Sequence, residues 1–175
     1  MKSLIISPHP DDEVLGAGGT LFKRKSSKKN NSLYWIIVTK LQSNTPKIKV
    51  LRRKNEIKKI SKLFGFKKVF QLNFNTTELD SSSKKRLIKD FSDIFKKIKP
   101  YELFVPHFSD VHSDHKIVSE VISTCTKNFR FPFIKKILAY EVLSETDYNL
   151  NRKKIFFPNY YEDISKFLTK KKNAM

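Results

Sequence analysis

The chain has 175 residues, and 36 lysines and arginines against 17 aspartates and glutamates give it a formal net charge of +19. This length suits one domain with a buried core, and an apolar content of 39% excludes a compositionally disordered chain. The single cysteine, Cys125, excludes an internal disulfide framework and a cysteine-rich zinc site, and we interpret it as a buried thiol.

The first half of the chain predicts two strands and two helices in alternation. Residues 3–7 form a short apolar run closed by Pro8, which is typical of a buried strand. Residues 13–25 have helical character. Residues 33–39 are continuously apolar, as expected for a parallel strand that is buried on both faces, and residues 50–64 repeat apolar side chains near the helical period.

The second half continues this alternation. Residues 69–74 alternate apolar and polar side chains and predict a strand, whereas residues 81–99 predict a helix that begins at serine caps and stops before a proline. Residues 103–105 and 137–143 predict two further strands, with a helix over residues 114–126 between them. Such an alternation implies βαβ units, so we expect an α/β fold of the Rossmann-like, three-layer α/β/α type with a mostly parallel sheet.

The sequence predicts one domain over residues 1–175, because it contains no internal repeat and no low-complexity linker. The amino terminus lacks the charged and apolar regions of a signal peptide, and no apolar run reaches the length of a membrane span. We therefore expect a cytoplasmic protein without a transmembrane segment. Homo-oligomerisation stays open.

Two groups of histidine and carboxylate residues follow predicted strands. The first is S-P-H-P-D-D-E at residues 7–13, and the second is D-V-H-S-D-H at residues 110–115. Three of the four histidines of the chain fall in these two motifs. Ligands of parallel sheets bind beyond the carboxyl ends of the strands, so both motifs begin where a site is expected.

These side chains are typical of a metal-dependent hydrolase. Two histidines and one carboxylate form a common catalytic zinc set whose fourth position is open to water. Zinc makes hydroxide available near neutral pH, and a neighbouring carboxylate outside the ligand set can act as general base. A lone His-Pro or Asp-Asp pair would be explained by a turn, but two such groups at strand ends favour a metal site.

The segments H-P-D-D-E-V-L-G-A-G-G-T at residues 9–20 and H-S-D-H at residues 112–115 resemble the LmbE-like, or PIG-L-like, family of zinc N-acetylglucosaminyl deacetylases. The resemblance extends over nearly the whole chain. It implies a metal-dependent amidohydrolase that removes the N-acetyl group from an N-acetylglucosamine-type amino sugar conjugate, either a small molecule or a lipid-linked sugar. The conjugate stays open, and so does the metal, since iron(II) can occupy a zinc site of this type.

The resemblance also assigns roles to individual residues. The metal ligands of the family match His9, Asp12 and His115. Asp11 matches the general base, and His112 matches a histidine that assists the tetrahedral intermediate. Asp114 matches the carboxylate that orients this histidine. Arg53, in an R-x-x-E pattern, is a candidate for a substrate contact, although a surface ion pair would explain it equally well.

Two segments depart from the family pattern. Many members carry a sugar-contacting acidic residue after the third strand, where this chain reads N-T-T-E at residues 75–78. The family also continues well past the segment that ends here at Met175, so the resemblance implies that the carboxyl-terminal part of the family domain is missing. Residues 166–175 offer little apolar face, so we expect a poorly ordered end and an open active-site mouth.

The glycines of the first motif, Gly16, Gly18 and Gly19, do not follow the G-x-G-x-x-G spacing of dinucleotide-binding loops. We interpret them as close-packing positions and predict no nucleotide cofactor.

Other functions stay open from the sequence. One is a metal-binding homologue that is catalytically weak because of its shortened end. Another is a nucleic-acid-binding protein, although no RNP-type motif, zinc finger or arginine-rich stripe accompanies the charge. We therefore expect no nucleic-acid partner, lysines on solvated outer helices, and acidic or neutral residues near the metal. A Ser-His-Asp hydrolase has little support, because the G-x-S-x-G elbow is missing.

Overall fold

A parallel sheet of five strands forms the centre of the computed structural model, which describes residues 1–27, 31–81, 84–143, 145–149 and 155–175. The strands follow one another across the sheet in the order β3-β2-β1-β4-β5, and all neighbouring pairs are parallel. Their bounds are Lys2–Ser7 for β1, Ser32–Lys40 for β2, Lys68–Asn75 for β3, Glu102–Pro106 for β4 and Lys136–Tyr140 for β5.

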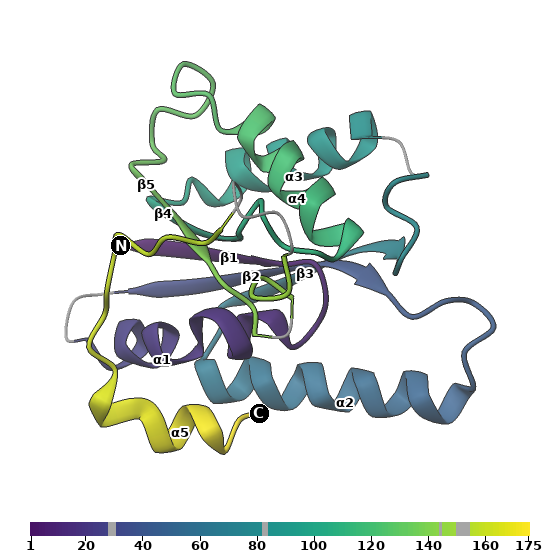
Figure 1. Cartoon of the computed structure of the whole chain (residues 1–175), viewed down its shortest axis with the longest axis horizontal. Coiled ribbons are helices and arrows are strands. Elements are labelled where there is room, and N and C mark those ends of the chain that lie inside the picture. Colours follow the sequence, from purple (N-terminus) through teal and green to yellow (C-terminus); the bar gives the residue numbers. More distant parts are fainter. Residues whose placement is uncertain (28–30, 82–83, 144, 150–154) are drawn as a thin grey trace.

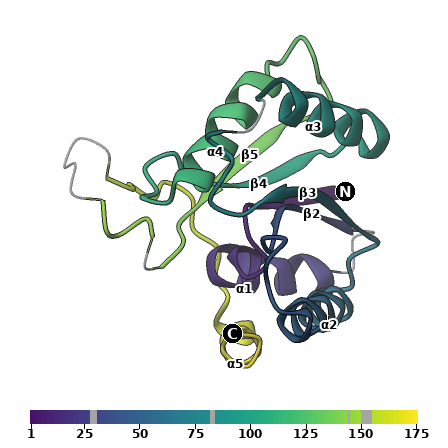
Figure 2. The same cartoon turned by 90° about the vertical axis from the view of Figure 1, so that its right-hand side faces the viewer.

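Helices cover both faces of the sheet. Their bounds are Asp12–Ser26 for α1, Lys47–Phe64 for α2, Lys84–Ile98 for α3, Ser113–Cys125 for α4 and Leu168–Lys172 for α5. Helices α3 and α4 lie on one face, and α1, α2 and α5 lie on the other (Figures 1 and 2). The predicted three-layer α/β/α architecture is therefore confirmed. Among the described residues, no helix has the length and apolarity needed to cross a membrane.

The core has two halves because successive side chains of a strand point to opposite faces of the sheet. Leu4 and Ile6 of β1 join the apolar cluster beneath α3 and α4. Ile5, between them, joins the second cluster with Trp35 and residues of α1. All three β1 side chains are fully buried, which explains why the central strands read as unbroken apolar runs rather than as alternating ones.

Strand β5 is shorter than the predicted strand at residues 137–143. Its last pairing partner is Pro106 at the end of β4, and the His107 amide then donates a hydrogen bond to the Tyr140 carbonyl at 3.0 Å. Beyond this point the Val142 amide bonds to the Thr146 hydroxyl instead of to a strand. The sequence stays apolar past Tyr140, but the partner strand β4 has already ended, so β5 ends there as well.

Helix α2 also differs from its prediction, because it begins at Lys47 rather than at residue 50. The carbonyl of Pro46 accepts hydrogen bonds from the Lys49 and Val50 amides and so opens the helix one turn earlier. The predicted serine caps of α3 fall partly at residues 82–83, which lie outside the described residues, and the helix is described from Lys84.

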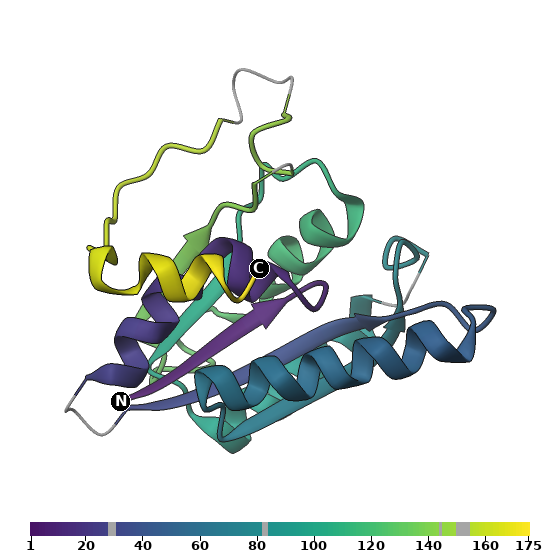
Figure 3. The same cartoon turned by 90° about the horizontal axis from the view of Figure 1, so that it is seen from below.

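The carboxyl-terminal segment packs against α1 (Figure 3), so the expectation of a poorly ordered end is wrong. Phe167 and Ala174 join the apolar cluster on this face of the sheet, and the Lys171 amine donates to the Leu15 carbonyl at 2.7 Å. Arg24 of α1 lies 2.8 Å from a Glu162 carboxylate oxygen. The prediction considered only the apolar face of residues 166–175, whereas ion pairs and residues just before this segment also hold it.

Two glycines of α1 are close-packing positions, in agreement with the interpretation of the G-A-G-G segment. A Cβ atom at Gly16 would overlap the ring of Tyr140 on β5. A Cβ atom at Gly19 would overlap the side chain of Ile164. The missing side chains therefore let β5 and the carboxyl-terminal segment approach α1.

Replacing Gly19 with alanine is expected to lower the free energy of unfolding by about 1–3 kcal/mol, because the new methyl group forces Ile164 away from α1. Gly18→Ala is the matched control. The nearest atom to its new Cβ would be the Lys171 Cγ at 3.5 Å, an ordinary contact, and the helix gains propensity. Urea unfolding of both variants measures the difference, and equal stability of the two would contradict the packing role of Gly19.

Candidate functional site

Strands β1, β2 and β3 extend to one side of the sheet, and β4 and β5 extend to the other, so the direction in which strands are added reverses between β1 and β4. The two histidine motifs meet at the carboxyl ends of these two strands. His9 lies in the loop after β1, and Asp12 is the first residue of α1. His112 is the N-cap residue of α4, and His115 lies in its first turn. The crevice outside this point of reversal is the usual ligand site of open parallel sheets.

Three side-chain atoms converge on one point of this crevice. His9 Nδ1 lies 3.1 Å from His115 Nε2. Asp12 Oδ2 lies 3.4 Å from the same His115 nitrogen and 3.8 Å from His9 Nδ1. Ligand atoms of a tetrahedral zinc ion, at bond lengths of about 2.0–2.1 Å, are separated by about 3.4 Å. The spacing of the three atoms therefore fits a tetrahedral divalent metal.

The hydrogen bonds of the two imidazoles support the same fit. His9 Nε2 lies 2.9 Å from Asp114 Oδ2, and His115 Nδ1 lies 2.8 Å from Asp110 Oδ2. A carboxylate accepts from the outer nitrogen of each ring, so the two facing nitrogens both carry lone pairs in the neutral rings. When both rings are neutral, neither of these nitrogens can donate to the other across 3.1 Å. A cation between them satisfies both, as in carboxylate–histidine–zinc sites.

His112 competes with Asp12 for the place of third ligand, because ligand nitrogens of His9, His112 and His115 lie within 4.8 Å of one another. However, His112 Nδ1 accepts a hydrogen bond from the Asp114 amide at 3.1 Å. Burial, together with the neighbouring His9 and His115, lowers the pKa of His112, so its ring is neutral near pH 7. A neutral ring that accepts at Nδ1 carries its proton at Nε2, which makes His112 a donor and favours Asp12 as the ligand.

The resemblance implies that the carboxylate of Asp114 orients His112, but in the structure this carboxylate lies beside another histidine. Its carboxylate contacts His9, and it also accepts from the Thr77 amide at 2.8 Å. Only its backbone amide reaches His112. Burial opposes ionisation of Asp114, but the hydrogen bonds from His9 and Thr77 outweigh it and hold the pKa of this carboxyl below its usual value. Asp114 thus orients His9 with its side chain and His112 with its main chain.

Sequence reasoning missed two residues that fix the imidazoles. Asp110 is fully buried and accepts from His115, and the Thr146 hydroxyl lies 3.3 Å from the same carboxylate oxygen. Asp110 stands in the second motif, five residues before His115, so its position was a signal that could have been used. The second residue is Thr77, whose amide holds the Asp114 carboxylate beside His9. Its φ of 63° is left-handed, which is strained for a β-branched residue, and no sequence pattern predicts this conformation.

Two neighbouring carboxyl groups of α1 are buried beside the site. Burial raises the pKa of Asp12 well above its usual value, so the ionised form needs a nearby cation. Burial also raises the pKa of Glu13 to about 8, although the Ser7 hydroxyl and the Asp11 amide donate to its Oε2. In the metal-free protein, Glu13 is therefore mostly protonated at neutral pH.

Replacing Glu13 with glutamine is expected to flatten the pH dependence of stability in the metal-free protein. Below pH 4.5 the folded and unfolded states both keep the proton of Glu13. Between pH 4.5 and about 8 the unfolded state loses this proton while the folded state keeps it, so the free energy of unfolding falls by a few kcal/mol. Glutamine cannot ionise and removes this decline.

Urea unfolding across this pH range in the presence of a chelator measures the effect of Glu13→Gln. Glu120→Gln, which changes an exposed carboxylate on α4, is the control and should keep the wild-type slope. An unchanged slope in Glu13→Gln would show that Glu13 ionises normally in the fold.

A cavity of about 870 Å³ opens beside the three converging atoms, and Asp11, Arg53 and His112 line it. The Asp11 side chain is 58% exposed and lies 4.0 Å from Arg53 Nη1. Arg53 donates to the Pro10 carbonyl at 2.7 Å, so it also braces the loop that carries His9. Because Lys40, Arg53 and Lys54 all line the cavity, its walls are not only acidic or neutral, contrary to our expectation.

The chain matches a deacetylase family and a known deacetylase in sequence. The model of the PIG-L family, described as GlcNAc-PI de-N-acetylase, matches residues 4–126. The diacetylchitobiose deacetylase of Thermococcus kodakarensis is 28% identical over 189 residues, covering 99% of this chain and 67% of that protein. The structure of N,N'-diacetylchitobiose deacetylase from Pyrococcus horikoshii superimposes with a TM-score of 0.74 at 26% identity, and the match covers 99% of this chain and 67% of the other.

The fold by itself does not decide the reaction. The 4-carboxy-2-hydroxymuconate hydratase of Pseudomonas putida shares it with a TM-score of 0.71 at 18% identity, over 99% of this chain and 77% of that one. The family match is more specific, because residues 4–126 include both histidine motifs and confirm the resemblance drawn from them. The chain belongs to the PIG-L, or LmbE-like, family of deacetylases.

Proposed function

We propose that this protein is a metal-dependent amidohydrolase that removes the acetyl group from an N-acetylglucosamine-type sugar. The observation that carries the proposal is the pair of facing imidazole nitrogens, 3.1 Å apart, with the buried Asp12 carboxylate beside them. Relatives named as diacetylchitobiose deacetylases support the choice of substrate class.

His9, Asp12 and His115 would hold the metal, which we propose to be zinc, with iron(II) as the second candidate. The chemistry that zinc supplies in such a site is polarisation of a carbonyl group and acidification of water to a pKa of about 7. Asp110 and Asp114 fix the orientation and tautomer of the two imidazoles, so the ligand set is arranged before the metal arrives.

Asp11 is the proposed general base. Its side chain lines the cavity, and in the chain it lies between the proposed ligands His9 and Asp12 without belonging to the converging atoms. It would take a proton from the attacking water and return it to the departing amine of the sugar. Arg53 Nη1 lies 4.0 Å from an Asp11 carboxylate oxygen. The same nitrogen donates a hydrogen bond to the Pro10 carbonyl and so restrains the loop that carries Asp11.

His112 is the proposed donor to the oxygen of the scissile amide. The Asp114 amide holds its Nδ1, so the remaining Nε2–H is available to a negative oxygen in the cavity. A donor fixed before the reaction stabilises a developing oxyanion without reorganisation.

Acetate release from N,N'-diacetylchitobiose and from N-acetylglucosamine tests this function directly. We expect release by the zinc-loaded chain, loss of release with a chelator, and recovery with added zinc. A metal-binding homologue without catalysis is the second candidate, and it would hold one metal per chain yet release no acetate. That outcome, obtained over a panel of N-acetylglucosaminides, would contradict the proposed enzyme.

A further inference from the structure

Helix α2 carries apolar side chains on the side that faces away from the sheet. At about 100° per residue, Ile48, Leu51 and Leu63 lie opposite Ile57 and Phe64, which pack into the core. The outward residues are 72%, 55% and 36% exposed, respectively. Apolar side chains are therefore exposed on this side near both ends of the helix, and the described part of the chain leaves them uncovered.

The same helix holds an unusual concentration of positive charge. Its 18 residues include eight lysines and arginines and one glutamate, whereas basic residues make up 36 of 175 in the chain as a whole. The glutamate, Glu56, already pairs with Arg52 and Arg53. Lys59 and Lys62 form no ion pair within the described residues, so the outward side of the helix has a net positive charge.

The apolar and basic side chains share one continuous surface, which we call the outer face of α2. It consists of Ile48, Leu51, Arg52, Lys59, Lys62 and Leu63. Four of these residues, Ile48, Leu51, Arg52 and Lys59, border a shallow groove on α2 together with Asn55 and Glu56. The helix lies at the periphery of the molecule, and no helix or strand among the described residues lies on its outward side (Figures 2 and 3).

We propose that the outer face of α2 docks on an anionic lipid bilayer. A helix with lysines and arginines around bulky apolar side chains is the arrangement that lies in a membrane interface, where the cations meet lipid phosphates and the apolar groups enter the acyl boundary. A nucleic acid would use the charges but would leave Ile48 and Leu51 exposed, and the outer face offers no aromatic ring for base stacking. The bilayer accounts for both kinds of side chain.

Docking places the catalytic cavity close to the membrane. Val50, Arg53 and Ile57, on the inward side of α2, line the cavity, so one helix diameter of about 10 Å separates it from the docked surface. If deacetylation is the function, as proposed above, docking holds the catalytic cavity at this distance from the bilayer surface.

Sedimentation with lipid vesicles tests the docking surface without reference to catalysis. We expect the wild-type protein to bind vesicles of phosphatidylcholine with one quarter phosphatidylglycerol and not vesicles of phosphatidylcholine alone. Lys59→Gln with Lys62→Gln is expected to weaken binding about thirtyfold, since each lysine at an anionic surface contributes about fivefold. Ile48→Ser with Leu51→Ser is expected to weaken it about tenfold.

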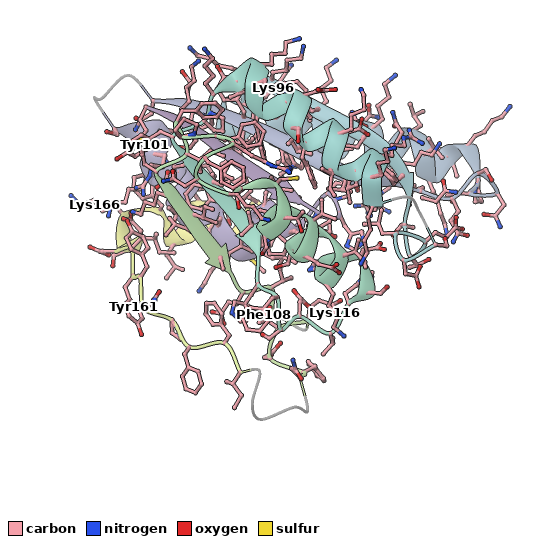
Figure 4. All side chains as sticks on the ribbon, turned by 90° about the horizontal axis from the view of Figure 1, so that it is seen from above. Lys96, Tyr101, Phe108, Lys116, Tyr161 and Lys166 are labelled. Atoms are coloured by element: carbon pink, nitrogen blue, oxygen red, sulfur yellow. The ribbon has the colours of Figure 1, made fainter. Side chains whose placement is uncertain are left out.

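The matched control is Lys96→Gln with Lys97→Gln, which makes the same charge change on α3, on the other side of the sheet (Figure 4). Its binding should stay within about twofold of wild type. An equal loss in this control, no loss in the Ile48 and Leu51 variant, or no binding to the anionic vesicles would each overturn the proposal. Turnover of soluble N,N'-diacetylchitobiose should be unchanged in both α2 variants, which separates a failure of docking from a failure of the deacetylase function.

Discussion

Replacing Asp12 with asparagine is expected to abolish tight metal binding, whereas replacing His112 with alanine is expected to preserve it. Asparagine keeps an oxygen for the hydrogen bond from the His9 amide, which is 2.7 Å long in the native protein. It removes the negative charge that would complete the ligand set with His9 and His115. The loss of affinity should exceed the 10–100-fold effect that is typical of changes outside the ligand set.

Comparison of the two variants shows whether Asp12 or His112 is the third metal ligand. The Asp114 amide binds His112 Nδ1, which leaves a protonated nitrogen that cannot hold a metal. Metal content after dialysis and titration calorimetry with zinc measure binding, and circular dichroism checks the fold. If His112→Ala loses the metal while Asp12→Asn keeps it, the three histidines form the site and the assignment of Asp12 is wrong.

Replacing Asp11 with asparagine is expected to leave one metal per chain and to lower acetate release by about 10²–10⁴-fold, the usual contribution of a general base. Its side chain is 58% exposed and stands apart from the converging ligand atoms, so the substitution should not disturb them. The rate constant for turnover should fall much more than the Michaelis constant changes, because the proton transfer belongs to the chemical step.

Glu145→Gln serves as the control for Asp11→Asn, because Glu145 is another carboxylate that lines the same cavity. This control should change acetate release less than tenfold if position relative to the metal, rather than negative charge in the cavity, is what matters. Near wild-type turnover in a fully metallated Asp11→Asn protein would remove Asp11 from the role of base.

The layers of the fold could be predicted from the sequence because each strand and helix is encoded locally. The apolar run at residues 33–39 and the helical period at residues 50–64 need no knowledge of their neighbours. The end of β5 at Tyr140 could not be predicted, since it is set by where β4 stops. Docking of the last helix was missed for a similar reason, because Ile164 packs over a glycine of α1 that is distant in the sequence.

In the candidate site, too, contacts between segments that are distant in the sequence could not be predicted for single side chains. That the two histidine motifs approach one another follows from their places after β1 and β4. The choice of which carboxylate holds which imidazole depends on distances between segments. Asp114 reaches His9 rather than the neighbouring His112 because the strained Thr77 presents its amide beside it. Spacing along the chain carries no information about that contact.

The docking of the carboxyl-terminal segment on α1 has a consequence for synthesis on the ribosome. Arg24 contacts Glu162, and Leu15 contacts Lys171, so these contacts of α1 form only after residues 162–171 have been synthesised. The chain grows from its amino terminus at about 5–20 residues per second. The segments with the proposed metal ligands, which end at His115, are translated before Ile164, and α1 keeps an uncovered surface until residues 162–171 have been synthesised.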